Sequence, residues 1–276
     1  MNLWDIFVAF VLGIVEGLTE FAPVSSTGHM ILVDDMIFQS KKLFSPEVAN
    51  TFKVVIQLGS ILAVVIVFKE RFFNLLGLKK DRSEDAEQGY KLSLKHVIVG
   101  MMPAAILGFL FNGYIDEHLF TAKTVVIGLI AGAILMLAAD WFRPSRPKVK
   151  TVDQITYKHA IGIGLFQCIA LWPGFSRSGS TMSGGVLLGL GHRAAADFTF
   201  IMAVPVMFGA SALSLVKHWD SFTMDALPFF IVGFISAFIF ALISIRFFLK
   251  LINKIKLVPF AIYRIVLAAI IYFFFL

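Results

Sequence analysis

Cysteine is almost absent from the sequence, with Cys168 alone among 276 residues. A single thiol excludes an intramolecular disulfide and a metal cluster built on cysteines, and we expect Cys168 to be a small packing residue. Charge is also scarce, at 15% of the chain against about 25% in an ordinary soluble domain. The N-terminus has neither a basic segment nor a small-residue cleavage site, so the sequence predicts no signal peptide.

Apolar residues fill 58% of the chain and include 30 phenylalanines. A soluble globule of this size has too little interior to hide that much apolar surface. Six uninterrupted apolar stretches are long enough to cross a hydrocarbon core of about 30 Å as helices. They are residues 50–68, 94–112, 122–141, 196–216, 227–248 and 257–276. The sequence therefore predicts an all-α polytopic membrane protein with six transmembrane helices.

Two further apolar stretches, 3–38 and 158–191, are interrupted by polar segments, GLTEFAPVSSTGH and LWPGFSRSGST. Irregular backbone within a membrane is tolerated where protein or a water-filled cavity satisfies its polar groups. We therefore expect each stretch to be a re-entrant helix-loop-helix hairpin. Each half of the chain, 1–141 and 151–276, then consists of one hairpin followed by three spans, within a single integral membrane domain.

Basic residues are concentrated in three loops, 69–95, 143–158 and 246–256. The positive-inside rule places these loops in the cytoplasm. The first hairpin then enters the membrane from outside and the second from the cytoplasm, so the two halves form an inverted-topology repeat. The net charge of +6 is explained by this topology, and we expect no nucleic-acid partner.

A constant offset of 151 residues supports an internal duplication. It matches Gly13 with Gly164, Glu16 with Gln167, Ser25 with Ser176, and Gly28 with Gly179. Spacing rather than overall identity carries this match.

The first polar interruption contains candidate catalytic groups. Glu16 and Glu20 lie four residues apart on one helix face, so either one carboxyl is protonated or a divalent cation lies between them. The following turn carries the hydroxyl groups of Ser25, Ser26 and Thr27. His29 comes next, within reach of Ser26, which provides a candidate nucleophile and a candidate general base.

The second polar interruption has the composition of a phosphate-binding turn. Ser176, Arg177, Ser178, Gly179 and Thr181 stand immediately before an apolar helix, where N–H groups, hydroxyls and a guanidinium favour an anion. An arginine at the bilayer centre without an anion costs at least about 2.5 kcal/mol. Arg177 therefore requires either a carboxylate of the first hairpin or a substrate phosphate as its partner.

Other residues within the apolar stretches carry weaker signals. We predict packing or end-of-span roles for four polar residues, Gln57, Asp140, Asp197 and Arg264. Two glycine pairs, Gly128 with Gly132 and Gly184 with Gly185, indicate close helix packing.

The strings EGLTEFAPVSSTGH and PGFSRSGST, together with FKVVIQLGSILAVV, resemble the signature regions of the BacA/UppP family of bacterial undecaprenyl-diphosphate phosphatases. The likeness covers essentially the whole chain. It implies removal of the terminal phosphate of undecaprenyl diphosphate at the outer face of the plasma membrane. That reaction regenerates the monophosphate carrier lipid for cell-wall synthesis and confers bacitracin resistance.

The resemblance also implies residue roles and partners. Glu16 and Glu20 would position a divalent metal, Mg²⁺ or Ca²⁺, while Ser26 is a candidate nucleophile, Arg177 binds phosphate and His29 acts as base or acid. Whether Ser26 forms a covalent intermediate or orients a water stays open. A homodimer is plausible by family analogy.

The alternative function is a polyprenyl-phosphate flippase or transporter using the same phosphate-binding cavity, because inverted repeats with paired hairpins are typical of carriers. The acids, serine and histidine favour hydrolysis, since a carrier needs no nucleophile.

Overall fold

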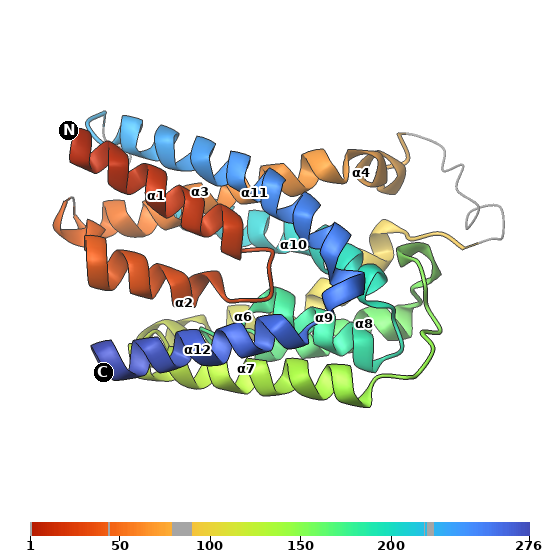
Figure 1. The fold of residues 1–276 in the computed structure, drawn as a ribbon. Helices are drawn as coiled ribbons and strands as arrows, with labels where there is room; N and C mark the ends of the chain where they lie inside the picture. Colours follow the sequence, from red (N-terminus) through yellow and green to blue (C-terminus); the bar gives the residue numbers. More distant parts are fainter. Residues whose placement is uncertain (1, 44, 79–89, 218, 220–223) are drawn as a thin grey trace.

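The computed structural model describes residues 2–43, 45–78, 90–217, 219 and 224–276 (Figure 1). Residues 79–89 of the first basic loop lie outside this description. Within the described ranges the regular structure is helical, apart from one isolated β-bridge between Val149 and Leu190. The predicted all-α class is confirmed for this part of the chain.

Five of the described helices are long and apolar enough to cross a membrane. They are α3 (Pro46–Val67), α6 (Leu94–His118), α7 (Ala122–Phe142), α10 (His192–Lys217) and α11 (Leu227–Ile255). They correspond to five of the six predicted spans. The sixth is the shorter apolar helix α12 (Val258–Phe275). Large side chains such as Phe109 and Trp141 are 81% and 84% exposed, and such outward apolar faces fit a polytopic membrane protein.

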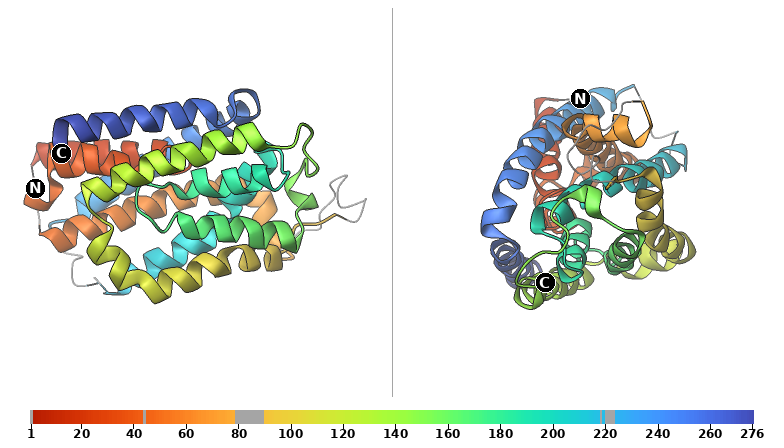
Figure 2. Two further views of the ribbon diagram at one scale, coloured as in Figure 1. Left: turned by 90° about the horizontal axis from the view of Figure 1, so that it is seen from below. Right: turned by 90° about the vertical axis from the view of Figure 1, so that its right-hand side faces the viewer.

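Each interrupted stretch contains two helical limbs and a turn. The first comprises α1 (Leu3–Thr19), α2 (Ser26–Met30) and the π-helix η1 (Ile31–Phe38), and the second comprises α8 (Tyr157–Ile169) and α9 (Arg177–Leu187). In Figure 1 α1 runs from the N-terminal end of the molecule to its middle, and α2 leads back towards the same end. In the second pair, in green and teal in Figure 2, α9 is largely buried within the bundle, whereas α8 has one exposed face with Ile161 and Leu165.

Short elements connect these helices. They are η2 (Ser40–Lys42), α4 (Lys69–Leu75) and η3 (Val152–Gln154). Figure 1 shows α4 and the connection between α7 and α8 at the end of the molecule opposite both termini. At this end Arg71 of α4 forms an ion pair with the buried Asp153 of η3, with 2.6 Å between Nη1 and Oδ2. The pair ties the first basic loop to the second.

Small residues allow α1 to approach α11 closely. A side chain at Gly17 would meet the backbone oxygen of Ala237 at 2.5 Å, and one at Gly13 would collide with Ser236. In the second half α8 packs against α6 in the same manner, because Gly164 lies against the backbone of Gly100. Close backbone approach through glycine is typical of helix pairs in membranes.

The predicted glycine pairs differ in what they contact. Gly184 faces Phe166 of α8, and Gly185 faces Ala195 of α10, so this pair packs between helices as predicted. The close packing predicted for Gly128 and Gly132 is present, but it involves a turn as well as a helix. Both glycines of α7 lie against the backbone of the turn that precedes α9, at the carbonyls of Pro173 and Phe175, and Gly132 also lies against the Arg264 side chain of α12. They make room for that turn inside the bundle.

Candidate active site

The two polar turns share one unusual backbone conformation. Ser25 and Ser176 both have φ of 71°, a value that residues other than glycine rarely adopt. Each hydroxyl accepts a hydrogen bond from the backbone N–H three residues later, at Gly28 and Gly179, with distances of 3.3 and 3.2 Å. Residues held in this region cost about 1–3 kcal/mol and cluster at functional sites. The offset of 151 residues thus relates two turns of the same shape.

Glu20 joins the two turns. Its Oε2 accepts a hydrogen bond of 2.6 Å from the Ser26 hydroxyl, and its Oε1 lies 3.1 Å from Nη2 of Arg177. The ion pair is largely shielded, since the side chains of Arg177 and Glu20 are 14% and 9% exposed. The structure therefore brings together three predicted site residues, and it provides Arg177 with the carboxylate partner that its position in the chain requires.

The Arg177 guanidinium makes further contacts with α10 and with the first turn. Nη1 lies 3.4 Å from the Thr199 carbonyl and Nη2 lies 3.3 Å from the Met207 sulfur, both on α10. Its Cζ lies 5.7 Å from the ring centre of Phe21 in the first turn, which adds a cation–π contact. The guanidinium is thus held at the junction of the first turn, α9 and α10.

Most hydroxyls of the second turn hold the turns themselves. Ser178 donates to the Ala22 carbonyl of the first turn at 3.1 Å, and its hydroxyl lies 3.2 Å from that of Ser176. Thr181 is fully buried and donates to the Arg177 carbonyl at 2.8 Å. The predicted phosphate-binding hydroxyls at these three positions are therefore close to the site but already hydrogen-bonded. Thr27, in the first turn, is half-buried.

His29 has two hydrogen-bond partners. Its Nδ1 lies 2.8 Å from the Ser25 carbonyl, and its Nε2 lies 2.7 Å from the hydroxyl of Tyr263 on α12. The structure thus pairs Ser26 with Glu20 and pairs His29 with Tyr263. Glu20, and not His29, is therefore the side chain in contact with the Ser26 hydroxyl.

Glu16 is buried one helical turn before Glu20, and its Oε1 has no hydrogen-bond partner within the described structure. Over the same residues, no group of three or more His, Cys, Asp or Glu side chains is arranged to hold a metal. Two carboxylates with one unpartnered oxygen still fit a hard divalent cation such as Mg²⁺, which commonly binds one or two carboxylates together with substrate phosphates and waters. The Arg177 contact leaves Glu16 as the more available ligand.

Two functional candidates on α12 were not singled out by sequence reasoning. Tyr263 gave no signal, because an isolated tyrosine in an apolar run has no recognisable partner in the sequence. Arg264 gave the signal of a cation in a membrane segment and was interpreted as a packing group. It is fully buried and donates to the carbonyls of Gly128 and Gly174 at 3.1 and 2.9 Å.

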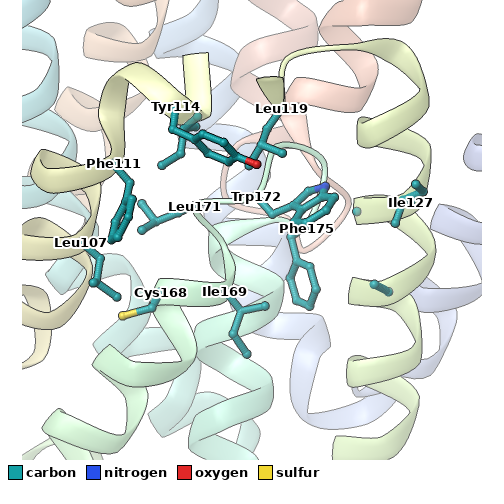
Figure 3. A pocket seen from close by; sticks show the side chains of 13 residues that line it. Leu107, Phe111, Tyr114, Leu119, Ile127, Cys168, Ile169, Leu171, Trp172 and Phe175 are labelled. Atoms are coloured by element: carbon teal, nitrogen blue, oxygen red, sulfur yellow. The ribbon is translucent and has the colours of Figure 1, made fainter. Parts of the chain in front are cut away.

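An apolar cavity of about 550 Å³ lies behind the second turn, between α6, α7 and α8 (Figure 3). Trp172 and Phe175 of that turn form one wall, and Phe111 and Tyr114 of α6 lie across from them. Cys168 is also at its wall. Since Glu20, Ser26 and Arg177 do not line it, this cavity is separate from the polar site.

The chain was compared with known proteins. It matches the family described as bacitracin resistance protein BacA over residues 9–270. It is 70% identical over 270 residues to the undecaprenyl-diphosphatase of Bacillus subtilis strain 168, covering 98% of each chain. It is 67% identical over 276 residues to undecaprenyl-diphosphatase 2 of Bacillus licheniformis, with both chains fully covered.

Proposed function

The chain belongs to the family of bacitracin resistance protein BacA, and we propose that it is a membrane phosphatase that converts undecaprenyl diphosphate to undecaprenyl phosphate. The observation that carries this proposal is the shared contact at Glu20. One carboxylate receives the hydroxyl of Ser26 from the first turn and the guanidinium of Arg177 from the second. A base, a hydroxyl and a phosphate-binding cation are the groups that phosphoryl transfer to an oxygen nucleophile needs.

In the proposed reaction Arg177 and the N-terminus of α9 bind the terminal phosphate, because both favour negative charge. Glu20 takes the proton of the attacking hydroxyl. Two routes use this geometry. Either Ser26 attacks phosphorus, undecaprenyl phosphate departs and water hydrolyses the phosphoserine, or Ser26 orients a water that attacks directly. Acid quenching during turnover of a terminally labelled substrate separates them, because only the first route leaves label on Ser26.

We assign the divalent cation, Mg²⁺ or Ca²⁺, to Glu16 and Glu20. Such an ion would polarise phosphate oxygens and offset the charge that develops on them. The unpartnered Oε1 of Glu16 supports this assignment. We expect chelation to abolish phosphate release and Glu16→Gln to raise the metal concentration needed for half-maximal rate. Retention of full activity in excess chelator contradicts a metal role.

The predicted topology supports a site reached from outside. We propose that residues 3–38 and 158–191 are re-entrant hairpins entering from opposite faces of the plasma membrane, within two inverted halves. The equal φ values of Ser25 and Ser176 support the repeat. A site built on the first hairpin then opens to the outer side. The homodimer remains a prediction. Light scattering of the protein in detergent tests it by measuring the protein mass of the complex.

A flippase of the same lipid phosphate has no need for the contact between Ser26 and Glu20. The deciding experiment is phosphate release from undecaprenyl diphosphate by the purified protein, comparing wild type with Arg177→Ala. Arg246→Ala is the matched control, since Arg246 is exposed on α11. We expect release by wild type and by the control, and loss in Arg177→Ala. No release from folded wild type contradicts the phosphatase and favours the carrier.

A further inference from the structure

We propose that Tyr263 and Arg264, consecutive residues of α12, are positioning residues that hold the two catalytic turns in register. Tyr263 acts on the first turn through His29, and Arg264 acts on the second turn through the Gly174 carbonyl. The proposal rests on the proposed phosphatase function, and it assigns a role in that reaction to the last helix of the chain.

Tyr263 and the Ser25 carbonyl hold the two nitrogens of the His29 ring. The Ser25 carbonyl can only accept, so Nδ1 of His29 carries the hydrogen in that 2.8 Å contact. In the neutral ring Nε2 is then an acceptor, and the Tyr263 hydroxyl donates to it at 2.7 Å. The two rings also stack, with centres 5.5 Å apart and planes 7° from parallel. The Ser25 carbonyl therefore sets the tautomer of the imidazole, and Tyr263 of α12 holds its Nε2 atom and its plane.

The position of His29 bears on Ser26 directly. Ser25 receives the His29 Nδ1–H on its carbonyl and precedes Ser26, whose hydroxyl donates to Glu20. A shift of the ring thus moves the backbone that carries the Ser26 hydroxyl. Catalytic groups tolerate little displacement, because a misplacement of about 1 Å costs about 100-fold in rate.

Arg264 holds the second turn against α7. Its Nη2 donates to Gly174, where φ is +87°, and to Gly128 of α7. A side chain at Gly179 would meet its Nη1 at 3.0 Å, so the guanidinium lies against the first turn of α9. None of the described acidic side chains forms an ion pair with it. A fully buried cation is costly without an anion, and here its charge adds to the field in which the phosphate is bound.

One helix can serve both turns because successive residues of an α-helix point about 100° apart. The helix itself is anchored by Asp140 of α7, whose Oδ2 accepts from the backbone N–H groups of Leu257 and Val258 at 2.8 and 3.1 Å. This confirms the end-of-span role predicted for Asp140. The start of α12 is thereby fixed relative to α7, against which the second turn also packs.

Tyr263→Phe tests the contact with the first turn. This change keeps the ring and removes the hydroxyl, and Tyr272→Phe on the exposed face of α12 is the matched control. We expect kcat to fall about tenfold, the effect of one hydrogen bond, with KM unchanged. The ¹⁵N spectrum of the histidines, assigned to His29 with His29→Gln, should show the Nδ1–H tautomer in both proteins, with the Nε2 resonance of His29 shifted in Tyr263→Phe by loss of the hydroxyl donor.

Arg264→Lys tests the contact with the second turn, with Arg246→Lys as the matched control. Lysine keeps the charge, but it lacks the planar guanidinium whose N–H groups reach the carbonyls of both Gly128 and Gly174. We expect KM to rise about tenfold, corresponding to about 1.4 kcal/mol of phosphate binding. A KM equal to that of the control overturns this half of the proposal. If Arg264→Lys fails to fold, the rise in melting temperature that inorganic phosphate causes is measured in Arg264→Gln instead of KM. We expect a smaller rise than in wild type.

The His29 Nε2 resonance separates this proposal from the phosphatase itself. An unchanged Nε2 resonance in Tyr263→Phe overturns the positioning role whatever the activity. A shifted Nε2 resonance in a protein whose wild type releases no phosphate refutes the phosphatase and leaves the positioning contact standing. A shifted Nε2 resonance together with the fall in kcat supports both.

Discussion

Among single residues, Glu20 connects the two halves of the site. Ser26 contacts one of its oxygens and Arg177 the other, so the carboxylate that we propose as proton acceptor is also the counter-ion of the arginine that we propose to bind phosphate. An incoming phosphate competes with Glu20 for Arg177. Binding of the substrate would therefore loosen the ion pair and leave the carboxylate to act on Ser26.

Glu20→Gln should separate charge from shape. The amide keeps the size of the side chain but accepts no proton, so we expect kcat to fall about 100-fold or more, as for loss of a general base. Glu117→Gln is the control, because Glu117 is an exposed glutamate at the end of α6. Phosphate release under saturating substrate measures the change. Near-normal kcat in Glu20→Gln contradicts the assigned base.

Because the backbone of Ser25 has a positive φ, we expect glycine at this position to destabilise the protein less than alanine does. Ser25→Ala loses a helix cap worth about 1 kcal/mol and retains the unfavourable φ, whereas Ser25→Gly loses only a few tenths. We expect the melting temperature of the glycine variant to exceed that of the alanine variant. Ser45, which caps α3 with φ of −71°, is the control. The difference in melting temperature between its glycine and alanine variants should be smaller than at Ser25. Equal gaps at the two sites contradict strain at Ser25.

At the residue scale, the clearest signal in the sequence is an ionisable group that interrupts an apolar run. Glu16, Glu20 and Arg177 were found in this way, because charge within a membrane segment needs a partner. The hydrogen-bond partner of His29 was not predictable from the sequence. His29 is three residues from Ser26 in the sequence, yet its ring bonds to Tyr263, because α12 approaches the first turn only in the folded bundle.

Among the helices, the packing of α1 on α11 positions the first turn. Glu16 and Glu20 follow Gly13 on the limb that packs on α11, so a change in the spacing of these two helices would displace both carboxylates. Ser244 of α11 also donates to the Leu18 carbonyl at 2.9 Å, near the end of α1. Substitutions on this interface should therefore affect both stability and the site.

Gly17→Ala should destabilise the protein by about 1–3 kcal/mol, since the new methyl group would lie 2.5 Å from the Ala237 oxygen and the helices must separate. Gly209→Ala is the control, because a side chain there has nothing within 4 Å. Thermal unfolding in detergent gives the comparison. A melting temperature for Gly17→Ala equal to that of Gly209→Ala contradicts the close packing of α1 and α11.

Element positions were largely predictable, because apolar length and polar interruption are local properties of the sequence. Five spans and both interrupted stretches were identified in this way. The partner of Gly128 and Gly132 was not, since close approach to a turn and close approach to a helix select the same small residues. The bond from Asp140 to the start of α12 likewise depends on the tertiary fold.

At the scale of the whole molecule, the proposed inverted topology makes a prediction about sidedness. In a Cys168→Ala background, Glu117→Cys should react with a membrane-impermeant maleimide in intact cells. Arg146→Cys should react only after permeabilisation, because it belongs to a basic loop expected in the cytoplasm. Both residues are exposed, so accessibility within the fold does not limit labelling. Labelling of Arg146→Cys in intact cells contradicts the orientation.

The central claim is that two turns, 151 residues apart in the sequence, form one site around Glu20. A double-mutant cycle on kcat/KM with Ser26→Ala and Arg177→Ala tests it most directly. Groups that act as a unit are strongly non-additive. We predict that the double variant is little slower than the slower single variant. Rate losses that multiply would show that the two turns act independently, and would contradict the single site.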